Sequence, residues 1–112
     1  MTAAIQRKVR ITLAAWRDIE EIVDWIADHD ALEKARHVLE RILNAAEKIA
    51  QRPHGGTRPK ELPADLGGEI RQVYFKPYRI VYRVSDEEIV IHLVVDGRRS
   101  LQSLLWRRLT NR

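Results

Sequence analysis

The hydrophobic positions of this chain change their period along the sequence, and each change marks an expected element. Apolar residues alternate with polar ones over residues 8–12, which is typical of a short strand. From residue 16 onward they recur every three or four positions while charged residues fill the opposite face, which predicts an amphipathic helix. Thr12 is expected to cap the start of this helix, which ends near His29.

A second helix is expected directly after the first. Asp30 and Glu33 have the spacing of a capping box, and apolar residues then recur at alternating steps of three and four as far as Ile49. Because only a short connection separates the two helices, they are expected to form an antiparallel hairpin. Arg52-Pro53 ends the second helix, and the proline and glycine residues up to Gly68 indicate a loop.

Three further strands are expected after this loop, at about 69–75, 78–85 and 89–95. The connections between them are short enough only for hairpin turns, so the strands form an antiparallel meander. Leucines at helical spacing predict a final helix over about 101–109. The order is therefore β-α-α-β-β-β-α, an α+β fold in which the antiparallel helical hairpin packs on one face of a small, mainly antiparallel curved sheet.

The composition fits one domain over residues 1–112, with residues 1–7 as a flexible tail. Hydrophobic residues make up 45% and charged residues 32% of the chain, which is typical of a globular protein rather than a disordered one. No apolar run approaches the ~20 residues of a membrane span, and the N-terminal residues show no export signal. The lack of cysteine excludes disulfides and thiolate metal sites. A cytoplasmic protein without a cofactor is expected.

The formal net charge of +4 lies in the C-terminal part of the chain. Residues 1–68 hold 11 basic and 11 acidic side chains, whereas residues 69–112 hold 9 basic and 5 acidic ones. A localised basic surface indicates nucleic acid or an acidic protein as a partner.

Arginines interrupt the predicted strands in a regular way. Side chains alternate along a strand, so Arg79 and Arg83 share the face opposite to the one expected under the helices. Guanidinium groups there would match phosphate and carboxylate groups. An ordinary solvated face with cross-strand ion pairs is the alternative interpretation. The expected basic face is concave, lined by Arg71, Arg79, Arg83 and His92, and closed by Arg98 and Arg99 after Gly97.

Other residues give weaker indications. The four histidines show no metal-ligand spacing, so no metal site is predicted. Trp16 is expected in the core, and Trp106 either anchors a partner or packs the final helix. A group of acidic residues on the first helix is interpreted as solvated outer surface: Asp18, Glu20, Glu21 and Asp24.

Four segments of the chain, taken together in their sequence order, resemble segments of the RelE/ParE toxin superfamily. The resemblance covers the chain from Lys8 onward and is most specific in the Tyr78–Arg83 strand and the Gly97-Arg98-Arg99 exit from the last strand. It implies a bacterial type II toxin that is encoded beside a neutralising antitoxin. The matching segments are Glu61-Leu62, Arg71-Gln72-Val73, Pro77 to Arg83, and Asp96 to Arg99 with the leucines from 101 to 109.

The resemblance implies one of two activities. RelE-like members cleave mRNA on the ribosome, and by position Arg79 and Arg99 match two of their arginines, with Arg71 near a third. The tyrosine that many of them use falls at Leu105, which can neither stack on a base nor exchange a proton. That departure and the long helical hairpin favour the ParE-like branch, whose members poison DNA gyrase by binding rather than by catalysis.

A toxin-antitoxin system with a ParE-like toxin, acting in growth arrest and plasmid stabilization, is therefore the leading hypothesis. The alternatives are a ribosome-dependent mRNA interferase that uses Arg71, Arg79 and Arg99, and an inactive relative that acts only in the antitoxin complex. In the ParE interpretation the target contacts are Arg79, Arg83, Arg98, Arg99, Arg107 and Arg108. An acidic, amphipathic segment of a ParD-like antitoxin is expected at Trp16, Trp25, Ile26 and Arg36. Operator DNA is expected only through the antitoxin, and no membrane is involved.

Overall fold

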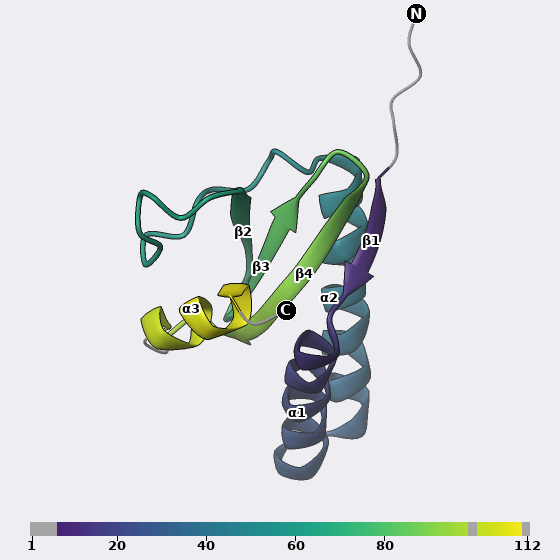
Figure 1. Cartoon of the computed structure of the whole chain (residues 1–112). Coiled ribbons are helices and arrows are strands. Elements are labelled where there is room, and N and C mark those ends of the chain that lie inside the picture. Colours follow the sequence, from purple (N-terminus) through teal and green to yellow (C-terminus); the bar gives the residue numbers. More distant parts are fainter. Residues whose placement is uncertain (1–6, 99–100, 111–112) are drawn as a thin grey trace, which may run out of the picture.

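The computed structural model describes residues 7–98 and 101–110, which form a sheet with helices on both of its faces (Figure 1). The order of the elements confirms the predicted β-α-α-β-β-β-α arrangement and the α+β fold. In chain order they are β1 (Lys8–Ile11), α1 (Leu13–His29), α2 (Leu32–Gln51), β2 (Glu69–Phe75), β3 (Tyr78–Val84), β4 (Glu88–Asp96) and α3 (Gln102–Thr110).

The sheet has the strand order β1-β4-β3-β2. Strands β2, β3 and β4 form the predicted antiparallel meander, and β1 joins the edge of β4 in parallel. The short turn after β2 pairs Phe75 with Tyr78, which places Tyr74 opposite Arg79. Further along, Tyr82 pairs with Ile91 but Val81 pairs with Leu93, so β4 carries one additional residue, a β-bulge, at this point.

The helix starts agree with the prediction in one case and not in the other. The Thr12 hydroxyl accepts a hydrogen bond from the Ala15 amide at 3.1 Å, so Thr12 caps α1 as predicted. The predicted capping box of α2 is wrong, because Ala31 occupies the N-cap position and has no side chain to cap with. Asp30 lies one residue too early and instead binds Lys34, four residues along, at 2.7 Å.

The helical hairpin covers one face of the sheet, as predicted. Apolar residues of α1 and α2 pack on the hairpin-facing side chains of β3 and β4. Burial of these apolar side chains between the hairpin and the sheet holds the two layers together. Its largest fully buried members are Ile19, Ile42, Ile80, Tyr82, Ile89 and Ile91.

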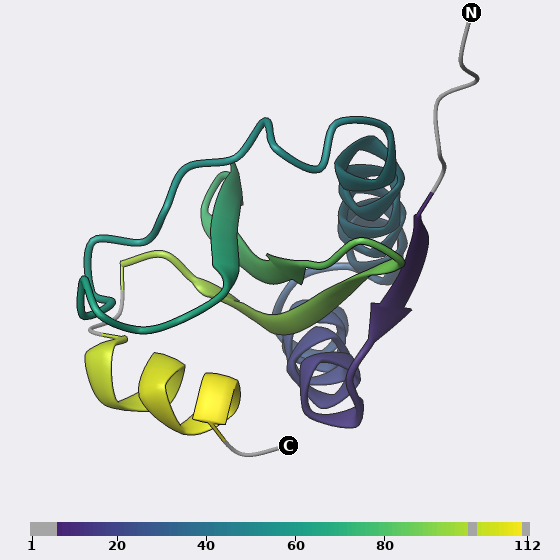
Figure 2. The same ribbon diagram turned by 45° about the horizontal axis from the view of Figure 1, so that its top comes forward.

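The second face of the sheet is also covered, which contradicts the expectation of an open, basic face. Figure 2 shows the sheet lying between the helical hairpin and α3. Leu101, Leu105 and Leu109 recur every four residues, and this stripe packs on the apolar side chains between the arginines of the strands. Those strand partners are Ile70, Val81, Leu93 and Val95, together with Leu62 of the preceding loop.

The loop 52–68 runs from α2 along the free edge of β2 (Figure 2). The buried Tyr82 hydroxyl donates to the Pro53 carbonyl at 2.9 Å, and Thr57 forms a bridge with Gln72. A side chain at Gly56 would meet the Tyr82 hydroxyl and the Gln72 carbonyl at 2.6 Å, so only glycine fits there. Of the residues expected as a tail, only Arg7 is described, and its guanidinium donates to the Ser85 carbonyl at 2.8 Å. No helix in the described part is both long and apolar enough for a membrane span.

Candidate functional site

Arg79 is the second residue of β3 and is only 6% exposed. One guanidinium nitrogen, Nη1, donates to Glu61 Oε2 at 2.7 Å and to Gln72 Oε1 at 3.1 Å. The Tyr74 ring lies 5.7 Å from the guanidinium carbon. The expectation that Arg79 projects from an open face is therefore wrong, because the loop that carries Glu61 covers it and neutralises its charge.

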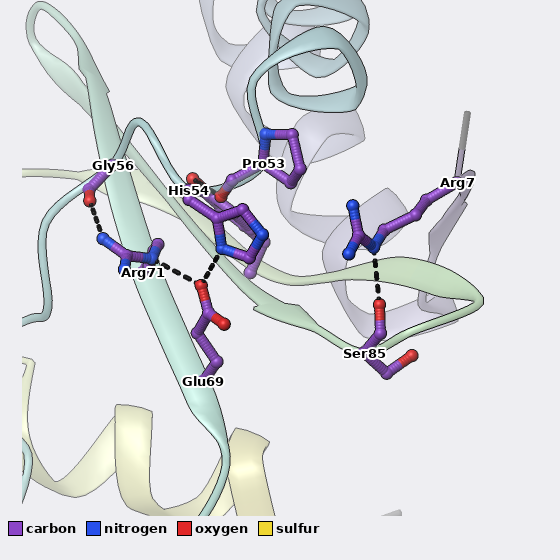
Figure 3. Close-up of polar contacts among 8 residues, drawn as sticks. Arg7, Pro53, His54, Gly56, Glu69, Arg71 and Ser85 are labelled. Atoms are coloured by element: carbon purple, nitrogen blue, oxygen red, sulfur yellow. Dashed lines mark hydrogen bonds and ion pairs between the residues drawn. The ribbon is translucent and has the colours of Figure 1, made fainter. Parts of the chain in front are cut away.

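Arg71 lies on the other face of the sheet. It pairs with Tyr82 in the register of β2 and β3, so both side chains point toward the hairpin side. The Arg71 Nε donates to Glu69 Oε2 at 2.7 Å and Nη1 donates to the Gly56 carbonyl at 2.5 Å (Figure 3). Arg71 and Arg79 therefore do not converge, and the predicted concave face that included both is wrong. The two-residue turn after β2 already predicts that Arg71 and Arg79 lie on opposite faces, because it fixes which residues of the two strands share a face.

Glu69 links Arg71 to the loop that precedes β2. Its carboxylate binds both the Arg71 guanidinium and the His54 ring, and Figure 3 shows the three side chains meeting at the edge of β2. The hydrogen bond from Arg71 lowers the pKa of Glu69, and the contact with His54 lowers it further. This cluster, Arg71, Glu69 and His54, holds the loop on the sheet and leaves no free guanidinium fork for a ligand.

Arg108 on α3 forms a bidentate ion pair with Asp18 on α1. Nη2 donates to Asp18 Oδ1 at 2.7 Å and Nη1 donates to Asp18 Oδ2 at 2.8 Å. The side chains are only 22% and 13% exposed, respectively. Hydrogen bonding to Asp18 raises the pKa of Arg108, so this guanidinium is charged at every accessible pH. Two predictions are wrong here: Asp18 is not solvated helix surface, and Arg108 is not free for a target, because the two side chains bind each other.

Arg83 and His92 lie below the C-terminal end of α3. Arg83 is partly buried, and its Nη2 donates to the Leu109 carbonyl at 3.5 Å. Burial lowers the pKa of His92 to about 4, and the nearby cations of Arg83, Arg10 and Arg108 add to this effect. His92 is therefore neutral at neutral pH and adds no charge to this part of the surface.

Two of the predicted target contacts are exposed in the described residues. Arg98 is 80% exposed and donates from Nε and Nη2 to the Asp96 carboxylate at 3.0 and 2.7 Å. Arg107 is exposed on α3, next to the exposed indole of Trp106. Arg99 lies outside the described residues. Trp106 and Arg107 also border a hollow of about 480 Å³ between α3 and the loop, lined further by Glu61, Leu62, Pro63, Gln102 and Ser103.

The residues predicted for antitoxin binding divide into exposed and buried ones. Trp16 and Trp25 are 39% and 60% exposed, so the expectation that Trp16 lies in the core is wrong. Ala15 and Ile19 take the inward positions of α1 in its place. Arg36 is exposed, but Ile26 is buried and is removed from the candidate surface. No three histidine, cysteine or acidic residues of 7–98 and 101–110 gather closely enough to hold a metal ion.

The family model for the ParE toxin of the type II toxin–antitoxin system parDE matches residues 9–101. This chain belongs to the ParE toxin family. Toxin ParE3 of Caulobacter vibrioides (strain ATCC 19089 / CIP 103742 / CB 15) is 25% identical over 91 residues, which cover 81% of this chain and 87% of that protein. The membership confirms the resemblance to the RelE/ParE superfamily.

Two solved structures share the fold of this ParE family member. A chain of the chromosomal ParDE TA system from P. aeruginosa superimposes with a TM-score of 0.69 at 23% identity, over 81% of this chain and 96% of that one. A chain of the YoeB dimer from Staphylococcus aureus gives a TM-score of 0.51 at 18% identity, over 78% and 92%. At these identities the likeness concerns the fold alone.

In this ParE family member, the residues that matched RelE-type catalysis do not form one site in the described part of the chain. Arg71 and Arg79 lie on opposite faces, each bound to a carboxylate. Leu105, at the position of the tyrosine, is fully buried between α3 and the sheet. The sequence interpretation missed Asp18 and Glu61 as the partners of buried arginines. One sequence feature could have identified Glu61, because it is the acidic residue of the Glu61-Leu62 segment that resembles the family. No such feature marked Asp18.

Proposed function

We propose that this ParE family member is the toxin of a type II pair, that it arrests growth by binding DNA gyrase, and that a cognate antitoxin neutralises it. The separation of Arg71 from Arg79 carries this proposal. Cleavage of RNA needs cationic donors that converge on one phosphate, where charge develops in the transition state. Two arginines on opposite faces of a sheet cannot supply such a site, which favours inhibition by binding.

The local charge balance supports the same conclusion. A guanidinium recognises phosphate best when its two parallel N–H groups are free. Glu61 binds Nη1 of Arg79 and Glu69 binds Nε of Arg71, so a carboxylate already pairs with each guanidinium. The mRNA interferase alternative would require both ion pairs to open, and the buried Leu105 would still offer no group for proton transfer.

The exposed part of α3 is the proposed target contact. Trp and Arg side chains are enriched at the energetically dominant centres of protein interfaces. Trp106 and Arg107 stand side by side on the outer side of α3, above the hollow formed with Pro63. We assign gyrase binding to these two residues together with Arg98, and keep Arg99 as a further proposed contact.

The proposed antitoxin surface is the exposed side of the helical hairpin, with Trp16, Trp25 and Arg36. The similar P. aeruginosa structure is described as a ParDE TA system, which supports a cognate antitoxin as the partner. An acidic, amphipathic segment would place apolar side chains on the tryptophans and carboxylates near Arg36. Contact with operator DNA through the antitoxin, a cytoplasmic location and a role in plasmid stabilization belong to the same proposal.

The test is a gyrase supercoiling and cleavage assay with the purified, antitoxin-free protein. We expect cleaved, linear plasmid to accumulate. Replacing Arg107 by Glu should reduce this product at least about tenfold, since it reverses a charge at the proposed contact. The matched control is Arg17→Glu, an exposed arginine of α1. An inactive wild-type protein in this assay, combined with cleavage of mRNA on added ribosomes, would overturn the proposal in favour of the interferase.

A further inference from the structure

The ion pair of Asp18 and Arg108 joins two residues that are 90 positions apart in the sequence. In both views the C-terminal end of α3 points toward α1 (Figure 1 and Figure 2). Both oxygens of Asp18 and both terminal nitrogens of Arg108 take part, which fixes the two side chains in one relative orientation. An exposed ion pair would have little effect on structure, but this pair is largely buried.

The same two side chains also complete the edge of β4. Strand β1 pairs with β4 only as far as Ile91, and the last backbone bond on this edge runs from the Thr12 amide to the Ile91 carbonyl at 3.1 Å. From the bulge residue His92 onward, Arg108 Nη1 donates to the His92 carbonyl at 3.1 Å and Asp18 Oδ2 accepts from the Val94 amide at 3.1 Å. The ion pair therefore satisfies the backbone groups that a longer β1 would have satisfied.

Few other contacts fix the orientation of α3. A helix of nine residues is too short to be stable without tertiary contacts. Its leucine stripe attaches α3 to the sheet, but apolar contacts are not directional. Apart from the contacts of Asp18 and Arg108, the polar contact between the described strands and α3 is the long hydrogen bond from Arg83 Nη2 to the Leu109 carbonyl, at 3.5 Å. Among the described residues, the Asp18–Arg108 pair is thus the directional link between α3 and the body of the protein.

We infer that Asp18 and Arg108 form a clasp that positions α3 and thereby presents Trp106 and Arg107 to the target. Trp106 and Arg107 immediately precede Arg108, so a rotation of α3 about its axis moves both of them away from the surface they now share. Asp18 and Arg108 are positioning residues in this inference and do not contact the target. The last step, from position to target binding, rests on the proposed function.

The experiment compares Arg108→Met with wild type by hydrogen–deuterium exchange, and measures growth arrest on expression without antitoxin. We expect the α3 amides to exchange at least about tenfold faster in Arg108→Met, with β3 and α2 unchanged, because the opening is local. Growth arrest per folded molecule should fall at least about tenfold. The matched control is Arg17→Met, which removes an exposed charge beside Asp18 and should change neither measurement. If Arg108→Met does not fold, Arg108→Lys keeps the charge but not the bidentate geometry and should show the same pattern more weakly.

Each contrary result has a distinct meaning. Unchanged exchange in α3 would overturn the clasp. Faster exchange in every element at once would show that the pair supports only global stability. Faster exchange confined to α3 with full growth arrest would overturn the positioning role. A wild-type protein that arrests no growth would refute the proposed function, whereas the exchange comparison would still decide whether the clasp holds α3.

Discussion

The Glu61 carboxylate lies 2.7 Å from the Arg79 guanidinium and ties the loop between α2 and β2 to the start of β3. Arg79 is also bound by Gln72, yet its Nε is buried without a hydrogen-bond partner among the described residues. The charge of Arg79 is therefore balanced mainly by one carboxylate that a loop supplies. This relationship turns a residue that resembles a catalytic arginine into part of the protein core.

Replacing Glu61 by Ala should destabilise the fold by about 2 kcal/mol, since it leaves Arg79 buried without its counter-ion. The value lies below the ~3–5 kcal/mol typical of a fully buried pair, because the Glu61 side chain is still partly exposed. Urea unfolding monitored by circular dichroism measures the change. The control is Lys60→Ala, an exposed neighbour in the same loop, which should be neutral. Equal midpoints for the two variants would contradict the structural role of Glu61.

Gly56→Ala should destabilise the protein by about 1–3 kcal/mol, because the new methyl group would collide with the Tyr82 hydroxyl and the Gln72 carbonyl. Neither of these atoms can move easily, since Tyr82 is fully buried and Gln72 is part of the sheet. The matched control is Gly67→Ala in the same loop, where no atom lies within 4 Å of the added group. Thermal unfolding of the two variants decides the matter, and equal melting temperatures would contradict the predicted close contact.

The sequence predicted the local elements well, because their signals are local. The cap at Thr12 and the strands at 69–75 and 78–85 follow from patterns within a few residues, and the structure agrees to within one residue at their ends. The start of α2 was not predicted correctly. Asp30 is the preferred N-cap residue by type, but the backbone places Ala31 at the N-cap position.

The contacts of the candidate site were less predictable, because the residues that bind each other are distant in the sequence. Periodicity places Asp18 on the polar side of α1 but does not reveal that Arg108, 90 residues later, will cover it. The leucine stripe of α3 was recognised, whereas the face that it covers was not. One error was avoidable: a two-residue turn between Phe75 and Tyr78 already places Arg71 and Arg79 on opposite faces.

Stability should fall as the pH is lowered from about 6.5 to about 4, in part because of His92. The pKa of this histidine is lowered in the folded state, so in this window the unfolded chain binds a proton that the folded chain does not. The contribution is fully present above the ordinary pKa of 6.5 and decreases toward pH 4, by about 1–2 kcal/mol because solvent screens the partly exposed ring. Urea unfolding at several pH values should show a shallower dependence for His92→Gln than for wild type. Because all other titrating groups are common to both proteins, parallel curves would rule out this role for His92.

The double variant Glu61→Met with Arg79→Met separates the two activities that the superfamily resemblance allows. Replacing both partners of a buried ion pair by apolar residues of similar size is often neutral for stability, so this variant should fold. A toxin that acts through Trp106 and Arg107 does not use Arg79, and we expect the variant to arrest growth as wild type does. The comparison variant is Glu61→Ala, which unbalances the pair and should lose activity only in proportion to its unfolded fraction. If the double variant is folded by circular dichroism but loses all growth arrest, Arg79 takes part in the activity directly, and the interferase hypothesis replaces the one proposed here.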